Sequence, residues 1–223
     1  MNGPRPQDNP QVDPLRVAVV VAHPDDESLW AGGMLLSHPE WDLFIVTLCR
    51  GEDPDRAPRF REALQRLGAS GAMGNLDDGP EQFPLPALVV QDAVLSLLPG
   101  RAFDLLLTHS PLGEYTWHRR HLEVSRAVWN LWRNGGLRAR RLWQFAYEDG
   151  GGAYPPRPRK EACLQLPLPE ETWQLKHGII TGVYGFGESS WEARAAGRAE
   201  AFDCFGAAGG PRCSDGNGRM PAP

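Results

Sequence analysis

Two short segments of the sequence carry histidines and carboxylates at spacings that suit a metal ion. The first is AHPDDE at residues 22–27, in which His23 is followed by Asp25, Asp26 and Glu27. His23 and Asp26 are three residues apart across a predicted strand-to-helix turn, so both side chains can converge on one point. An imidazole nitrogen beside a carboxylate is a usual beginning of a zinc or iron(II) site.

The second segment is HRRH, with His118 and His121 at the start of a predicted helix. Residues three apart share a helix face, so both imidazoles point the same way. One of them can bind a metal ion while the other reaches a substrate. Each feature also has a simpler interpretation, because a single histidine there is more often a surface residue and Asp25 or Asp26 can cap a helix. The two segments together favour the metal site.

The elements that must position these segments alternate between strand and helix. Apolar runs predict strands over 16–22, 42–49, 103–108 and 142–147, and helices are predicted over 27–38, 59–67, 86–98, 118–133 and 170–178. This alternation predicts a mainly parallel sheet with helices on both faces. Ligands of such sheets bind beyond the carboxyl ends of the strands, which is where both histidine segments begin.

Length and composition limit the class of protein to which this chain can belong. The chain has 223 residues and a formal charge of −5, which argues against a nucleic-acid binder. We expect no membrane span and no signal peptide, and the four scattered cysteines favour a reducing, cytoplasmic setting. Residues 1–15 and 206–223 are rich in Pro or Gly and are predicted to be disordered tails. A single α/β domain over 16–205 remains.

The motifs resemble those of the LmbE-like (PIG-L) zinc-dependent N-deacetylases, whose signature AHPDDE stands here unchanged. Weaker matches follow in order along the chain: TLCRGE at 47–52, RFRE at 59–62, LDD at 76–78, TH at 108–109 and the lysine-containing segment 176–184. The resemblance implies a Rossmann-like, three-layer α/β/α fold. One departure is that the family's His-x-Asp-His reads His-Arg-Arg-His here, with Arg120 in place of the aspartate.

The resemblance also implies roles for the site residues. His23, Asp26 and His121 would bind one Zn²⁺ per chain, although Fe²⁺ uses the same kind of ligand set. Asp25 would be the general base that takes a proton from water. A protonated His118 would stabilise the oxyanion. Because Arg120 replaces the aspartate, another carboxylate, such as Glu114 or Glu123, would have to support that charge.

The implied reaction is hydrolysis of an N-acetyl group, on an N-acetylglucosamine-type sugar or glycoconjugate. Arg59, Trp117 and His109 are the candidate substrate contacts, although Arg59 could instead pair with Glu62 and His109 could simply end a strand. Two alternatives stay open, an amidase for a non-sugar or thiol-conjugate amide and a non-catalytic module that binds a sugar or nucleotide. The sequence is compatible with a homo-oligomer, and we expect neither nucleic acid nor a membrane as partner.

Overall fold

A computed structural model describes residues 13–115 and 118–206. The elements, in chain order, are β1 (Arg16–Val21), α1 (Asp26–Leu36), β2 (Asp42–Thr47), α2 (Arg56–Leu67), β3 (Ser70–Met73), α3 (Ala87–Leu97), β4 (Ala102–Thr108), α4 (Arg119–Arg133), β5 (Arg138–Phe145), β6 (Tyr147–Glu148), β7 (Arg157–Pro158), β8 (Leu164–Pro167), α5 (Glu170–Gly178), a π-helical segment η1 (Ile179–Val183), α6 (Trp191–Ala195) and β9 (Ala199–Gly206). The predicted tails lie almost wholly outside the described residues.

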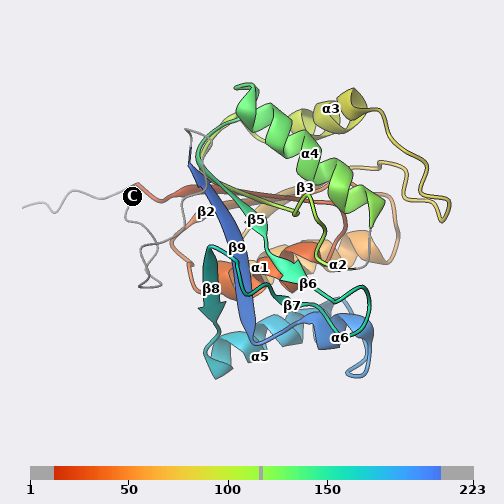
Figure 1. Ribbon diagram of the computed structural model, residues 1–223, viewed down its shortest axis with the longest axis vertical. Coiled ribbons are helices and arrows are strands. Elements are labelled where there is room, and N and C mark those ends of the chain that lie inside the picture. Colours follow the sequence, from red (N-terminus) through yellow and green to blue (C-terminus); the bar gives the residue numbers. More distant parts are fainter. Residues whose placement is uncertain (1–12, 116–117, 207–223) are drawn as a thin grey trace, which may run out of the picture.

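A seven-stranded sheet runs through the middle of the molecule in the order β3-β2-β1-β4-β5-β9-β8 (Figure 1). The first five strands are parallel, β9 pairs antiparallel with β5, and β8 pairs antiparallel with β9. β6 and β7 form a separate two-stranded sheet. The predicted α/β class with a mainly parallel sheet is therefore confirmed.

Helices cover both faces of the sheet, and the burial of β1 shows why its sequence is a continuous apolar run. Val17, Val19 and Val21 pack into the core on the side of α1 and α2. Ala18 and Val20 pack on the opposite side, against α3 and α4. Figure 1 shows α3 and α4 together on one side of the sheet and α1, α2 and α5 on the other. A strand that is buried on both faces is apolar at nearly every position, so its sequence does not alternate between apolar and polar residues.

A buried ion pair fixes α1, whose first turn carries Asp26. Lys176 Nζ on α5 lies 2.7 Å from Glu200 Oε1 on β9, and both side chains are fully buried. The same carboxylate accepts the amide hydrogens of Gly33 and Met34, at 2.7 and 2.8 Å. A buried carboxylate needs a positive charge and hydrogen-bond donors around it. The Lys176–Glu200 pair therefore holds α1, α5 and β9 together at one position.

The structure differs from the predicted elements at several places. α2 begins at Arg56 rather than at 59, because Pro58 falls in the first turn, where a missing N–H costs nothing. β5 begins at Arg138, so the basic stretch at 138–141 is the start of a strand. The predictions also missed β3, β8 and β9. No helix among the described residues is both long and apolar enough to cross a membrane.

Candidate metal centre

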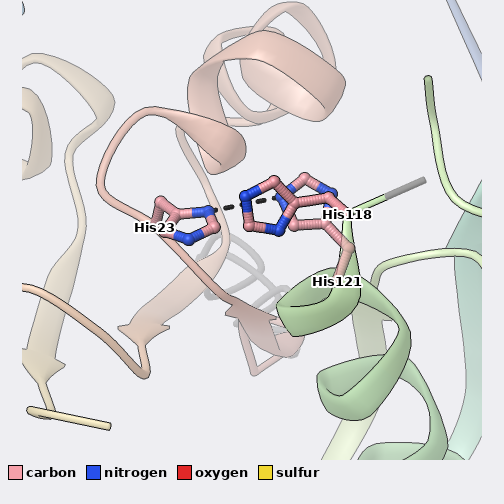
Figure 2. Close-up of side chains that lie close together, drawn as sticks. All are labelled: His23, His118 and His121. Atoms are coloured by element: carbon pink, nitrogen blue, oxygen red, sulfur yellow. Dashed lines mark hydrogen bonds between the residues drawn. The ribbon is translucent and has the colours of Figure 1, made fainter. Parts of the chain in front are cut away.

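The two histidine segments meet at the carboxyl ends of β1 and β4, which are neighbours in the sheet. From β1 the chain continues to β2 on one side, and β4 lies on the other side, so the strand order reverses at this point. Loops diverge at such a reversal and leave a crevice for ligands. Figure 2 shows His23, on the loop after β1, facing His118 and His121 at the start of α4.

Three side-chain atoms form a nearly equilateral triangle. His23 Nδ1 lies 3.2 Å from Asp26 Oδ2 and 3.3 Å from His121 Nε2, the contact dashed in Figure 2. His121 Nε2 lies 3.4 Å from Asp26 Oδ2. Ligand atoms held about 2.0–2.1 Å from a tetrahedral zinc ion are ~3.3 Å from one another. The side chains therefore fit a zinc-like ion without rearrangement.

Two further carboxylates fix which nitrogen of each histidine is free. Glu114 Oε2 accepts the Nδ1–H of His121 at 2.7 Å, so the lone pair of Nε2 points into the triangle. Asp78 Oδ1 lies 3.2 Å from His23 Nε2, which leaves Nδ1 as that ring's ligand atom. Carboxylate partners of this kind orient metal-binding imidazoles and raise their basicity.

Glu114 is fully buried and also serves His109. It lies 3.1 Å from His109 Nδ1 and accepts the amide hydrogen of Ser110 at 2.7 Å. Burial disfavours its charge, but His109 and His121 lower the pKa of Glu114 to about 2. The Glu114 side chain is therefore a carboxylate at neutral pH.

His109 lies behind the ligand atoms rather than in the pocket. Its ring is fully buried and stacks on His121, with centroids 3.9 Å apart. Its Nε2 lies 3.0 Å from the amide nitrogen of Ala22. Burial disfavours a charge on the ring, but Glu114 and Asp26 raise the pKa of His109 to about 9. His109, which the sequence suggested as a substrate contact, is thus absent from the cavity lining and packs against the ring of His121.

Asp25 has an unusual backbone conformation, with φ of 122°. Its amide hydrogen is accepted by Glu27 Oε2 at 3.1 Å, and Glu27 in turn accepts the hydroxyl hydrogen of Tyr184 at 2.7 Å. Such a φ is costly for a residue with a Cβ and persists only where its surroundings impose it. Burial, together with the nearby charge of Asp26, raises the pKa of Asp25 well above its usual range.

A cavity of about 290 Å³ borders the triangle on the side of His23 and Asp26. Its lining comprises His23, Pro24, Asp25, Asp26, Leu29, Arg50, Arg56, Asp78, Tyr115, His118, Trp191 and Glu192. The arginine that enters from α2 is Arg56, which lies 3.4 Å from Asp25 Oδ2. Arg59 is not in the lining. It pairs instead with Asp55 at 2.8 Å and donates to the carbonyl of Val183. Trp117 lies outside the described residues.

His118 lines the cavity, but the expected support for its positive charge is absent from the described residues. Burial and the neighbouring imidazoles lower the pKa of His118 to about 4, so the ring is neutral at pH 7. Its Nδ1 is buried without a hydrogen-bond partner there. Glu114 bonds His109 and His121, and Glu123 bonds Arg120. Neither of the two carboxylates suggested as a support therefore bonds His118.

Sequence reasoning named Glu114 only as a possible support for His118, gave Asp78 no role, and missed the wall formed by Tyr115 and Trp191. The two rings of that wall are 4.6 Å apart between centroids. For Asp78, the LDD segment was the available signal. No motif marked Glu114, although it lies only seven residues before His121.

Comparison with known proteins identifies the fold. No protein-family model matches the sequence, and no curated protein matches it either. Among solved structures, N,N′-diacetylchitobiose deacetylase from Pyrococcus horikoshii matches with a TM-score of 0.66 and 16% identity, over 88% of this chain and 85% of that one. The conserved protein TT1542 from Thermus thermophilus matches with a TM-score of 0.58 and 23% identity, over 84% of this chain and 93% of that one.

A third match comes from a protein with a different reaction. GalB, the 4-carboxy-2-hydroxymuconate hydratase from Pseudomonas putida, matches with a TM-score of 0.55 and 19% identity, over 81% of this chain and 82% of that one. The chain has the fold of the LmbE-like deacetylases, as the motifs predicted. This fold carries more than one chemistry, so the reaction must be argued from the site.

Proposed function

We propose that this chain is a metal-dependent amidohydrolase that removes an N-acetyl group from an amine. The observation that carries the proposal is the triangle of His23 Nδ1, Asp26 Oδ2 and His121 Nε2, with edges of 3.2–3.4 Å, beside an open cavity. Three protein ligands and an open side are typical of catalytic rather than structural zinc sites.

The donor set of two imidazoles and one carboxylate suits Zn²⁺ and also Fe²⁺. When bound, such an ion supplies a Lewis acid and lowers the pKa of a coordinated water toward ~7. The protein holds the donors ready for it. Trp30 Nε1–H donates to Asp26 Oδ1 at 3.0 Å, which leaves Oδ2 toward the two histidines.

Asp25 is the proposed general base. Its carboxylate lines the cavity beside the ligand Asp26 and lies 3.4 Å from Arg56 Nη1. A raised pKa makes a carboxylate a better acceptor for the proton of an attacking water. Glu27 holds the Asp25 amide and so fixes the direction from which the base acts.

His118 is the proposed donor to the oxygen of the substrate amide. A neutral imidazole keeps one N–H, and that hydrogen stabilises negative charge as it develops on the carbonyl oxygen. The ring of His118 stands edge-on to His23, with centroids 4.7 Å apart, so it borders the space where the amide must lie.

The proposed substrate is an N-acetylated sugar or glycoconjugate of modest size. The cavity of about 290 Å³ is at the lower end for small-molecule sites, and its rim combines Trp191 and Tyr115 with Glu192 and Arg56. Aromatic faces stack on sugar rings, and charged side chains bond their hydroxyls. The diacetylchitobiose deacetylase that shares the fold makes this class the first to assay.

The test begins with the metal content of protein purified without added metal, measured by elemental mass spectrometry. We expect about one zinc or iron per chain and acetate release from N-acetylglucosamine or diacetylchitobiose. Asp26→Ala and His121→Ala should both lose the metal. The exposed variant Glu62→Gln, on the surface of α2, should keep both metal and activity.

Other outcomes identify other functions. Acetate release only from non-sugar amides would change the proposed substrate class but would leave the proposed mechanism as it is. Bound metal with binding of sugars but no hydrolysis of any amide would favour a binding module. Hydration of an unsaturated acid, the type of reaction in the name of GalB, would move the chain to that chemistry. A protein that takes up neither Zn²⁺ nor Fe²⁺ would refute the proposal.

A further inference from the structure

We propose that Arg120, the residue that stands where the resembling motif has aspartate, positions Asp78 against the metal ligand His23. The inference rests on the proposed function. Its basis is that one buried guanidinium joins the helix turn that carries His121 to the loop that carries Asp78.

Arg120 is almost completely buried, with 1% of the residue exposed. Its Nε–H donates to the carbonyl oxygen of Asp77, and Nη2 lies 3.3 Å from the Asp77 carboxylate. Nη2 also donates to the carbonyl oxygen of Phe83 at 2.9 Å, and Nη1 donates to Glu123. The guanidinium therefore bonds two points of one loop and a carboxylate of its own helix.

The loop between β3 and α3 is held on its β2 side by backbone hydrogen bonds, such as that from the Leu76 amide to the Leu48 carbonyl oxygen at 2.9 Å. Residues 74–86 form no helix or strand. Beyond the bonds of Arg120, α4 holds this loop through Glu123 Oε1, which accepts the Leu85 amide hydrogen at 3.0 Å. The loop thus takes its position relative to α4 chiefly from the Arg120–Glu123 pair.

Asp78 is the part of this loop that reaches the metal centre. Its Oδ1 bonds His23 Nε2 at 3.2 Å, and its Oδ2 lies 2.7 Å from Arg50 Nη2. Asp77, which Arg120 grips at both its carbonyl and its carboxylate, is the preceding residue. A displacement of Asp77 therefore displaces the carboxylate that orients the His23 ring.

Only arginine can make this set of bonds. A guanidinium presents five N–H groups in a rigid plane, enough to serve two carbonyls and a carboxylate at once. A lysine in its place would keep the charge opposite Glu123 but could not span the same acceptors. Aspartate at this position would repel Asp77 and Glu123.

The experiment measures Zn²⁺ affinity by chelator competition for the parent protein, Asp78→Asn, Arg120→Met and the double variant. We expect Asp78→Asn to weaken Zn²⁺ binding about 10–100-fold, as other partners of metal-binding histidines do. Arg120→Met should weaken it about 10-fold, at the lower end of the same range. In the Asp78→Asn background, however, Arg120→Met should cause no further loss. Losses that multiply, or an unchanged affinity in Arg120→Met, would overturn the inference.

Two more variants separate positioning from general stability. Arg120→Lys retains the charge and should fold, so a loss of affinity close to that of Arg120→Met supports the geometric role. Arg159→Met removes a partly buried arginine that pairs with Asp203, away from the site. It should lower the melting temperature without changing Zn²⁺ affinity. Equal affinity losses for Arg159→Met and Arg120→Met would show a merely structural effect.

A metal-free measurement keeps the inference distinct from the proposed function. In crystal structures of the apo protein and apo Arg120→Lys, we expect the contact between Asp78 Oδ1 and His23 Nε2 to be lost only in the variant. Retention of that contact would overturn the role of Arg120 even if the parent protein binds zinc. Its loss would support the role even if the parent protein binds no metal.

Discussion

Replacement of Glu114 by glutamine tests the electrostatic design of the site. The Glu114 carboxylate is fully buried, and its oxygens lie 2.7–3.1 Å from two imidazole nitrogens and one amide nitrogen. Glutamine has nearly the same shape but carries no charge, and one end of its amide would face donors. The variant therefore removes the charge and keeps the volume.

The magnitude follows from the pKa. In the folded chain the pKa of Glu114 is about 2, against 4.5 for an unperturbed glutamate. Since one pKa unit corresponds to 1.36 kcal/mol, the ionised side chain stabilises the fold by about 3 kcal/mol at pH 7. A lowered pKa means that this contribution is complete above pH ~5 and is lost as the pH falls toward 2. By pH 3, roughly half of it remains.

The assay is urea unfolding of the metal-free proteins in chelator, followed by tryptophan fluorescence from pH 7 to pH 3. We expect Glu114→Gln to be about 3 kcal/mol less stable than the parent at pH 7, with the gap narrowing as the pH falls. The control Glu62→Gln, at an exposed pair with Arg66, should stay within ~0.5 kcal/mol throughout. A gap for Glu114→Gln that is the same at pH 7 and pH 3 would refute the reasoning.

Three further expectations follow from the structure. Asp25→Asn should retain one zinc per chain but lose at least ~100-fold in kcat; turnover near the parent value would remove Asp25 from the base role. Hydrogen bonds to carboxylates and the charge of Asp26 outweigh burial and raise the pKa of both His23 and His121 above 6.5, so protons compete with metal. Zn²⁺ affinity, measured by titration calorimetry, should therefore fall at least ~10-fold per pH unit below neutrality, and a flat profile from pH 8 to 6 would contradict this. Finally, a Cβ at Gly71 would lie 2.5 Å from the carbonyl oxygen of Ile45, so Gly71→Ala should cost about 1–3 kcal/mol in thermal or urea unfolding. Gly187→Ala, where nothing lies within 4 Å, should cost less than ~1 kcal/mol, and equal costs would contradict the expected clash.

β1, β2 and β4 could be predicted from the sequence because they are largely buried on both faces, whereas the parallel strand β3 is short and only partly buried. A run such as RVAVVV at 16–21 has no other stable place in a protein of this size. β8 and β9 were not predictable in the same way. β8 is the edge strand, β9 lies between it and β5, and the two pair antiparallel through contacts such as Leu164 with Phe202. Each is short or only partly apolar, and its partner is distant in the chain.

The candidate ligands could be predicted because AHPDDE and HRRH each bring their donors together within one turn. Their supporting carboxylates could not. Asp78 is 55 residues from His23, and their contact depends on the path of an irregular loop. The prediction placed the start of α2 three residues too late. Arg56, in the first turn of α2, lies at the cavity, whereas Arg59, about one turn further on, bonds Asp55 and the carbonyl of Val183.

The spacing of the donors along the chain has a consequence for how the protein is assembled and how long it lasts. His23 and His121 are 98 residues apart, and they meet only after β4 has paired with β1. A chain interrupted before α4 lacks His121 and therefore has no complete ion-binding site. In the finished protein a bound ion would act as a reversible cross-link that closes a loop of nearly 100 residues. A covalent bridge of that span restricts the unfolded chain by about 4–5 kcal/mol. Metal loading would then also protect the protein against proteolysis.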